Sequence, residues 1–172
     1  MKTILLFVFV LFINTTLFSQ INIDNDNYKF HIEYNKNWKS GNKIETDKKD
    51  VINYSFSKVS KKDTMTSAFI AFKLNAQTNI DDFIYKLEKD FNLNIPEKTN
   101  GYKNINGDVY EGKSADYKDN ETIEKIYYYS TTKDISGNYF CYMVRFIANT
   151  KYNQNDFNTE ATNIANTFKI NF

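Results

Sequence analysis

The chain has 172 residues with 22 basic and 21 acidic side chains, one histidine and a formal net charge of +1. Without a surplus of positive charge it is not expected to bind nucleic acid, because such binding depends on clustered contacts to phosphates. The single cysteine, Cys141, excludes an intramolecular disulfide bond. The length suffices for one domain with its own core.

The start of the chain is typical of a secretory signal peptide. Lys2 provides a positive charge, an unbroken apolar run follows over residues 4–13, and Ser19 precedes the predicted cleavage point. This run is shorter than the roughly 20 residues that cross a bilayer, so we favour cleavage over retention as a membrane anchor. We therefore expect residues 1–19 to be removed and residues 20–172 to form a single exported domain without a stable membrane anchor.

Alternation of apolar and polar residues with period two predicts strands in the first half of the chain. The pattern covers residues 28–34 and 52–56, whereas residues 69–74 are apolar on both sides and are expected in the middle of a sheet. Residues 35–41 are interpreted as a turn-rich loop with one tryptophan, and residues 24–27 as a polar linker.

Two segments change to helical spacing. Apolar residues at i, i+3, i+4, i+7 and i+11 predict a helix over residues 79–91, with Thr78 or Asn79 as its cap. A second stripe of this kind predicts a helix over residues 154–167. Both stripes are expected to pack against a sheet.

The segment between the helices predicts further antiparallel strands. Residues 102–105 are expected to pair with residues 109–117 through an Asn-Gly turn, and strands follow over residues 122–131 and 139–148. The links between these strands are too short for parallel crossovers. The order of elements therefore predicts an α+β fold in which helices are layered on an antiparallel sheet.

Candidate catalytic groups are few. His31 lies on the polar side of a predicted strand, and Cys141 lies within an apolar strand, where a thiol is generally inert. The sequence contains neither a zinc-type ligand cluster nor a glycine-rich phosphate loop. We therefore predict no catalytic, metal-binding or cofactor-binding residue, and a protein that is not an enzyme.

Four acidic residues allow a different hypothesis, because two carboxylates are enough for glycoside hydrolysis. They alternate with lysines, however, and this pattern favours cross-strand ion pairs on a solvated sheet face. The four are Glu111, Asp116, Glu121 and Glu124.

Aromatic residues, 17% of the chain, offer the main candidates for an interaction surface. Alternation places Tyr127 and Tyr129 on the face opposite Tyr128. If helices cover both faces of the sheet, these rings belong to the core. If one face is open, Tyr127 and Tyr129 would form a platform for a protein, a glycan or a lipid. Trp38 is the third candidate, with a place at one end of the core as its alternative.

The run from Tyr28 to Trp38 resembles the opening strand, loop and tryptophan of the PsbP superfamily. The helix over residues 81–91 and the ending over residues 164–168 are similar to the same pattern. The resemblance implies an α/β/α sandwich with a central antiparallel sheet of about six or seven strands and two main helices. It also implies an interaction or assembly protein rather than an enzyme, and it transfers no functional residue to this chain.

Together these observations predict an exported, non-enzymatic interaction or assembly protein of the PsbP-like type, with a protein of the cell envelope as its partner. It would be periplasmic or secreted. The alternative is a carrier of small apolar ligands, which needs a cavity between sheet and helix. A carboxylate-dependent hydrolase is the least favoured hypothesis.

Overall fold

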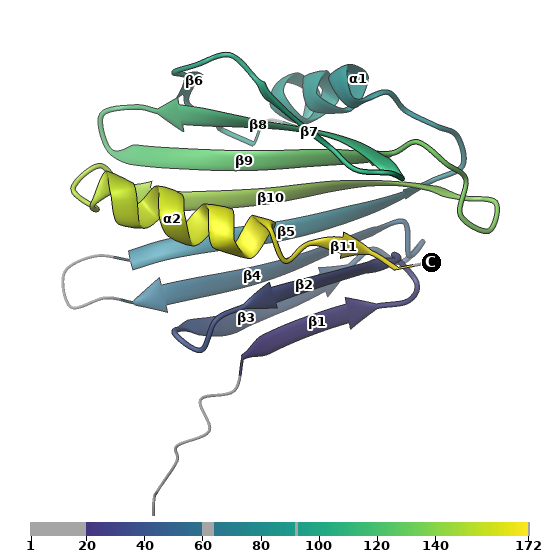
Figure 1. Cartoon of the computed structure of the whole chain (residues 1–172), viewed down its shortest axis with the longest axis horizontal. Coiled ribbons are helices and arrows are strands. Elements are labelled where there is room, and N and C mark those ends of the chain that lie inside the picture. Colours follow the sequence, from purple (N-terminus) through teal and green to yellow (C-terminus); the bar gives the residue numbers. More distant parts are fainter. Residues whose placement is uncertain (1–19, 60–63, 92, 172) are drawn as a thin grey trace, which may run out of the picture.

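The computed structural model describes residues 20–59, 64–91 and 93–171 (Figure 1). The signal peptide predicted over residues 1–19 lies outside the described residues. Within them the chain forms two sheets, and every pair of neighbouring strands is antiparallel.

The larger sheet has eight strands in the order β3-β4-β5-β10-β9-β8-β6, with β7 also paired to β8. Their bounds are β3 (Trp38–Glu45), β4 (Val51–Val59), β5 (Thr64–Leu74), β6 (Glu97–Lys98), β7 (Lys103–Asn106), β8 (Tyr110–Lys118), β9 (Thr122–Thr131) and β10 (Tyr139–Asn149). The strand predicted to be central over residues 69–74 is part of β5, which lies between β4 and β10.

The smaller sheet has three strands in the order β1-β2-β11. They are β1 (Ile21–Asn25), β2 (Phe30–Tyr34) and β11 (Lys169–Ile170). The helical segments are α1 (Ile80–Tyr85), which continues as the π-helical η1 (Lys86–Asp90), and α2 (Gln154–Ala165). Asn79 caps α1, because its side chain accepts a hydrogen bond from the Asp82 N–H, and Asn153 caps α2 in the same way.

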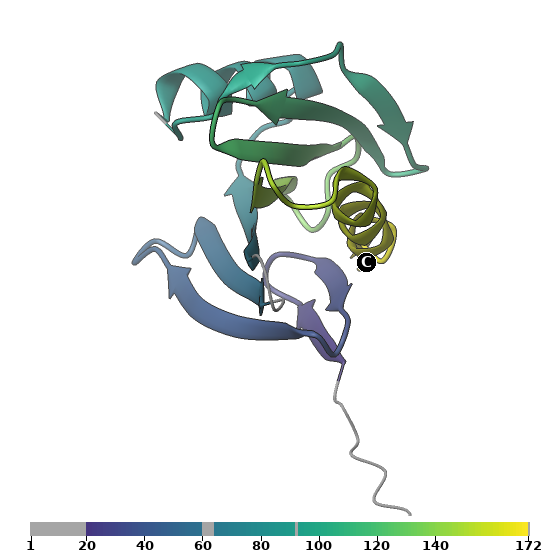
Figure 2. The ribbon, with the colours of Figure 1, turned by 90° about the vertical axis from the view of Figure 1, so that its left-hand side faces the viewer.

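Different elements cover the two faces of the larger sheet. The smaller sheet and α2 lie over one face, and α1 with η1 lies over part of the other (Figures 1 and 2). The first face builds the main core, in which Phe69 and Phe146 of the larger sheet join Phe30 of β2 and Phe157 of α2. The predicted α+β sandwich is confirmed.

Two segments interpreted from the sequence as irregular are strands. β1 includes part of the predicted linker, and β3 begins inside the predicted loop. After the buried Trp38, every residue of β3 is exposed, so both of its sides face water and the sequence carries no alternation. The larger sheet consequently has more strands than the six or seven expected.

β3 is irregular where Gly41 approaches the neighbouring strand. Its pairing with β4 shifts register between Ser40 and Lys43, which marks a β-bulge. A Cβ at Gly41 would lie only 2.6 Å from the Ser55 Oγ, so a larger residue does not fit without a shift. The Ser55 hydroxyl accepts from the Asn42 N–H and donates to the Asn42 carbonyl, and it thereby satisfies the bulged backbone.

His31 links the strands of the smaller sheet. Its Nδ1 lies 2.7 Å from Asp24 of β1, and its Nε2 lies 2.8 Å from Glu33 of β2. On the other side, Lys169 of β11 is its backbone partner. The hydrogen bonds with Glu33 and then Asp24 raise the pKa of His31 above its usual value, against the effect of burial. Both ring nitrogens donate when the imidazole is charged, so the imidazolium is the form that suits this site.

We predict that His31 makes the stability of the protein depend on pH. Because the folded-state pKa is raised, the stabilisation is fully present below the unfolded-state value of about 6.5 and is lost as the pH rises through the folded-state pKa. Urea unfolding of the wild type and His31→Gln from about pH 5.5 to about pH 9 measures this. The difference between the two should be largest at the acidic end, and a difference independent of pH would contradict the prediction.

Phe157 provides a test of the core between α2 and the larger sheet. Its side chain is completely buried, so Phe157→Ala is expected to lower the free energy of unfolding by about 3–5 kcal/mol. The matched control is Thr159→Ala at an exposed position of the same helix, with an expected change within about 0.5 kcal/mol. Equal losses in the two variants, measured by urea titration, would show that α2 does not pack as described.

Candidate functional site

The three aromatic residues predicted as an interaction surface lie in the main core. Trp38, Tyr127 and Tyr129 have exposed fractions of 3%, 5% and 2%. Tyr127 and Tyr129 belong to the face of β9 that the smaller sheet and α2 cover, so they cannot form an open platform there. The structure thus places all three in the core, the alternative left open by the sequence.

Trp38 is held by a carboxylate of α2. Its indole N–H donates to Oε1 of Glu160 at 2.6 Å, and the Asn35 side-chain amide donates to the same oxygen. The other oxygen, Oε2, lies 2.8 Å from the Lys58 ammonium of β4. Burial disfavours the charge on Glu160, but the hydrogen bonds from Lys58 and Trp38 outweigh it and hold the pKa of this carboxyl below its usual value.

The opposite face of the larger sheet is only partly covered. On this face, α1 contacts β8 and β9, and none of the described helices lies over β3 and β4 (Figure 2). The contacts of α2 with these two strands are on the other face. Pairing places Ile44 opposite Asn53 and Asn53 opposite Ile70, so these three side chains share this face. We define the open face as Ile44, Asn53, Ile70, Phe72 and Phe91. Ile44 and Phe91 have exposed fractions of 62% and 58%.

Phe91 ends the helical segment with its ring exposed. Its N–H bonds to the Lys86 carbonyl at 3.2 Å, five residues back, which is the pattern of a π-helix. Phe83 and Leu87 of the same apolar stripe are buried, whereas the ring of Phe91 is exposed and keeps an edge contact with Phe72 at 6.3 Å between ring centroids.

Glu88 fixes this π-helical turn to the sheet. The hydroxyls of Tyr102, Tyr117 and Tyr128 all donate to its Oε1. Three donors on one carboxylate oxygen make a strong anchor, since hydrogen bonds to charged groups contribute about 1.5–3 kcal/mol each. The exposed position of Phe91 is therefore held by a fixed helical segment.

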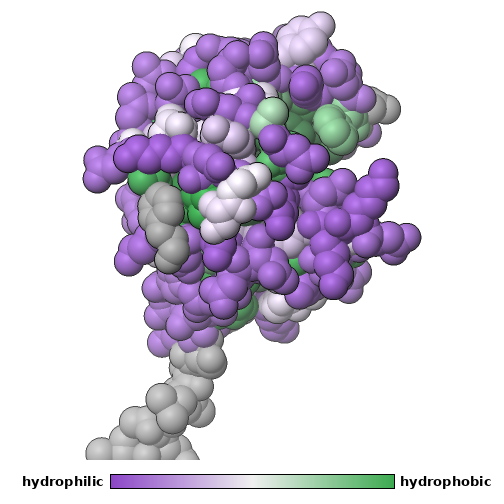
Figure 3. Space-filling model, turned by 90° about the vertical axis from the view of Figure 1, so that its right-hand side faces the viewer, coloured by the Kyte–Doolittle hydropathy of each residue, from purple (hydrophilic) through white to green (hydrophobic). Residues whose placement is uncertain are grey.

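A small apolar pocket lies beside Phe91, where α1 and η1 meet β5. Its cavity volume is about 120 Å³. Its lining consists of apolar side chains, one threonine and one lysine: Phe72, Leu74, Thr78, Phe83, Lys86, Leu87 and Phe91. An apolar area among hydrophilic surface is visible on this side of the molecule (Figure 3). Such a pocket can accept one apolar side chain and can offer an ammonium group at its rim.

Asp116 and Glu124, two of the four carboxylates considered for hydrolysis, do not converge. Asp116 pairs with Lys125 at 2.6 Å, and Glu124 pairs with Arg145 through two hydrogen bonds of 2.8 Å. The register opposes Asp116 to Lys125 and Tyr117 to Glu124, so Asp116 and Glu124 project from opposite faces of the sheet. Both are bound in ion pairs, which fits the cross-strand interpretation.

His31 and Cys141 lie in separate environments. His31 bonds to carboxylates in the smaller sheet, whereas Cys141 is buried in β10 and its thiol contacts the Ser130 hydroxyl at 3.5 Å. Burial raises the pKa of the Cys141 thiol to about 11. Within the described ranges, no group of three or more histidine, cysteine, aspartate and glutamate side chains is placed to hold a metal ion.

Comparison with known proteins identifies the fold. No protein-family model and no curated protein matches this chain. The solution structure of cyanobacterial PsbP (CyanoP) from Synechocystis sp. PCC 6803 is similar with a TM-score of 0.54 and 12% identity, over 91% of this chain and 95% of that chain. The crystal structure of LpqN, involved in cell envelope biogenesis of Mycobacterium tuberculosis, has a TM-score of 0.53 and 11% identity, over 90% and 91%. The fold is therefore PsbP-like, as the resemblance implied.

Within the described part of the chain, no helix is both long and apolar enough to cross a bilayer.

Glu160 gives a sharp test of the network around Trp38. Glu160→Ala removes the acceptor of Trp38 and Asn35 and leaves the half-buried Lys58 ammonium without its partner, so we expect a loss of about 3–5 kcal/mol in unfolding free energy. Trp38→Phe removes only the indole donor and part of the ring. In the double variant, measured by urea titration, the two losses should be clearly less than additive. Additive losses would contradict the described contact.

Proposed function

We propose that this protein is an exported, non-catalytic interaction or assembly protein that binds a partner protein of the cell envelope through the open face. The observation that carries the proposal is the exposed Phe91 beside an apolar pocket, next to the part of this sheet face, at β3 and β4, that no helix of the described chain covers. Exposed apolar groups gathered in one place are characteristic of protein-binding sites.

The chemistry of the pocket suits a polypeptide. A volume of about 120 Å³ is below the roughly 300 Å³ of a typical ligand pocket, but it fits a single apolar side chain. Lys86 at the rim would attract a partner with an acidic residue near that side chain. This size favours an interaction protein over the alternative, a carrier of small apolar ligands.

The structural comparison supports the same class. LpqN is described as involved in cell envelope biogenesis, and its fold is shared by this chain at low identity. Together with the predicted signal peptide, this supports a place in the periplasm or outside the cell. The ionisable groups described above also support a non-enzymatic role, because they are bound in ion pairs or buried.

A pair of matched variants tests the proposal. Phe91→Asp places a charge at the pocket, whereas Tyr85→Asp changes an equally exposed aromatic residue, with an exposed fraction of 63%, that does not line it. The wild type and both variants are produced in the host, and stoichiometric partners are quantified by native mass spectrometry of the envelope fraction. We expect Phe91→Asp to lose its partner at least tenfold and Tyr85→Asp to retain it.

Other outcomes of this experiment are also informative. A small apolar molecule bound to the wild type and lost from Phe91→Asp would replace the interaction proposal by the carrier alternative. Equal partner binding by both variants would show that the open face is not the binding surface. Thermal unfolding of the isolated variants verifies that both remain folded, as expected for exposed positions.

A further inference from the structure

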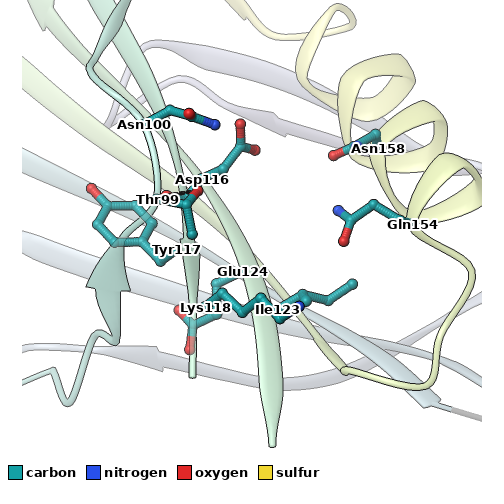
Figure 4. A pocket seen from close by; sticks show the side chains of 9 residues that line it. All are labelled: Thr99, Asn100, Asp116, Tyr117, Lys118, Ile123, Glu124, Gln154 and Asn158. Carbon is teal, nitrogen blue, oxygen red and sulfur yellow. Dashed lines mark hydrogen bonds between the residues drawn. The ribbon is translucent and has the colours of Figure 1, made fainter. Parts of the chain in front are cut away.

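A second pocket lies on the other side of the larger sheet, between the first turns of α2 and the ends of β6 and β8 (Figure 4). Its volume is about 250 Å³. The residues that line it are Thr99, Asn100, Asp116, Tyr117, Lys118, Ile123, Glu124, Gln154 and Asn158. We call it the polar pocket, and it shares none of its lining with the open face.

The strand register decides which side chains enter the polar pocket. Lys118 is opposite Ile123, and Asp116 is opposite Lys125, so these side chains lie on the face covered by α2. Tyr117 and Glu124 belong to the other face, where they bind Glu88 and Arg145. The pocket therefore has a carboxylate, an ammonium and one apolar side chain on its strand side.

The helix side of the polar pocket is lined by amides. Gln154 and Asn158 are four residues apart on α2 and extend toward Asp116 across the opening (Figure 4). The amide oxygen of Asn158 is buried without a hydrogen-bond partner among the described residues. Such a buried group costs about 1–3 kcal/mol while it has no partner, and the side chain that carries it extends into the opening, where a bound molecule can supply one.

The charges at the polar pocket leave one ammonium available. Only Oδ1 of Asp116 is occupied by the Lys125 ammonium, at 2.6 Å, which leaves the second oxygen able to accept further hydrogen bonds. Glu124 is bound to Arg145, so Lys118 is the charged group of this lining that forms no ion pair with another described residue. The ammonium donates, the free carboxylate oxygen accepts and the amides do both, so a ligand rich in hydroxyl groups suits this lining.

We propose that the polar pocket binds one neutral hexose or N-acetylhexosamine unit of a glycan. Each sugar hydroxyl donates and accepts, as the carboxamides of Asn100, Gln154 and Asn158 do. The free oxygen of Asp116 accepts from a neighbouring hydroxyl, and Ile123 contacts the apolar face of the ring. Binding is the whole event, because Asp116 has no second carboxylate on its face of the pocket.

The proposal is tested by titrating the isotope-labelled protein with N-acetylglucosamine, glucose and mannose and following backbone amide signals by NMR. We expect shifts confined to the strand ends near Thr99 and Asp116 and to the first turns of α2. The affinity should fall at least tenfold in Asn158→Ala, which matches about 1.4 kcal/mol or the loss of one hydrogen bond. Asn155→Ala, an exposed asparagine of the same helix outside the lining, is the matched control.

Gln154→Ala, at an exposed position, gives the same test if Asn158→Ala fails to fold. No localised shift with any of the three sugars would overturn the proposal. The same affinity in the wild type and in Gln154→Ala would also overturn it. A short neutral peptide that binds at the pocket where the sugars do not would replace the ligand class. Because Phe91 lies on the other face, Phe91→Asp should bind sugar like the wild type, so this test is independent of the open face.

Discussion

One carboxylate, that of Glu160, fixes the connection through which the chain passes from the smaller sheet to the larger one. Asn35 follows β2, Trp38 begins β3, and both donate to Glu160 of α2, which also binds Lys58 of β4. A carboxylate with so little exposure is tolerated only when its oxygens are satisfied, so losing one of these contacts weakens the case for the others. They lock α2 and the smaller sheet onto the same face, and the main core depends on that position.

This arrangement explains how so many aromatic residues fit into a chain of modest size. Rings from both sheets and α2 interlock in the main core, such as Tyr34 stacked on Phe56 at 3.9 Å and Tyr129 stacked on Phe168 at 4.4 Å between centroids. The aromatic residues that attract attention in the sequence therefore serve stability. Among the described residues, the large apolar side chains that remain exposed are Ile44, Tyr85 and Phe91.

The fold could be predicted from the sequence to the extent that its signals are local. Periodic patterns predict the strands with one solvent-exposed face and both helices, and the turn residues Asn106 and Gly107 predict a hairpin. All of these elements are present in the structure. β3 escaped prediction because both its sides face water. The candidate site escaped for other reasons. The bond between Trp38 and Glu160 joins residues 122 positions apart, and the apolar stripe groups the exposed Phe91 with residues that are buried.

The bulge at Gly41 has a consequence for how the edge of the larger sheet can meet other chains. β3 ends the larger sheet with a long, solvated edge, and a regular edge of this kind can recruit the strands of foreign chains. The register shift interrupts the row of backbone groups, and exposed Lys39 and Lys43 flank it with positive charge. An added strand would lose its pairing within a few residues and would meet these charges. By permitting the bulge, the single residue without a side chain in β3 makes this edge a poor template for strand addition.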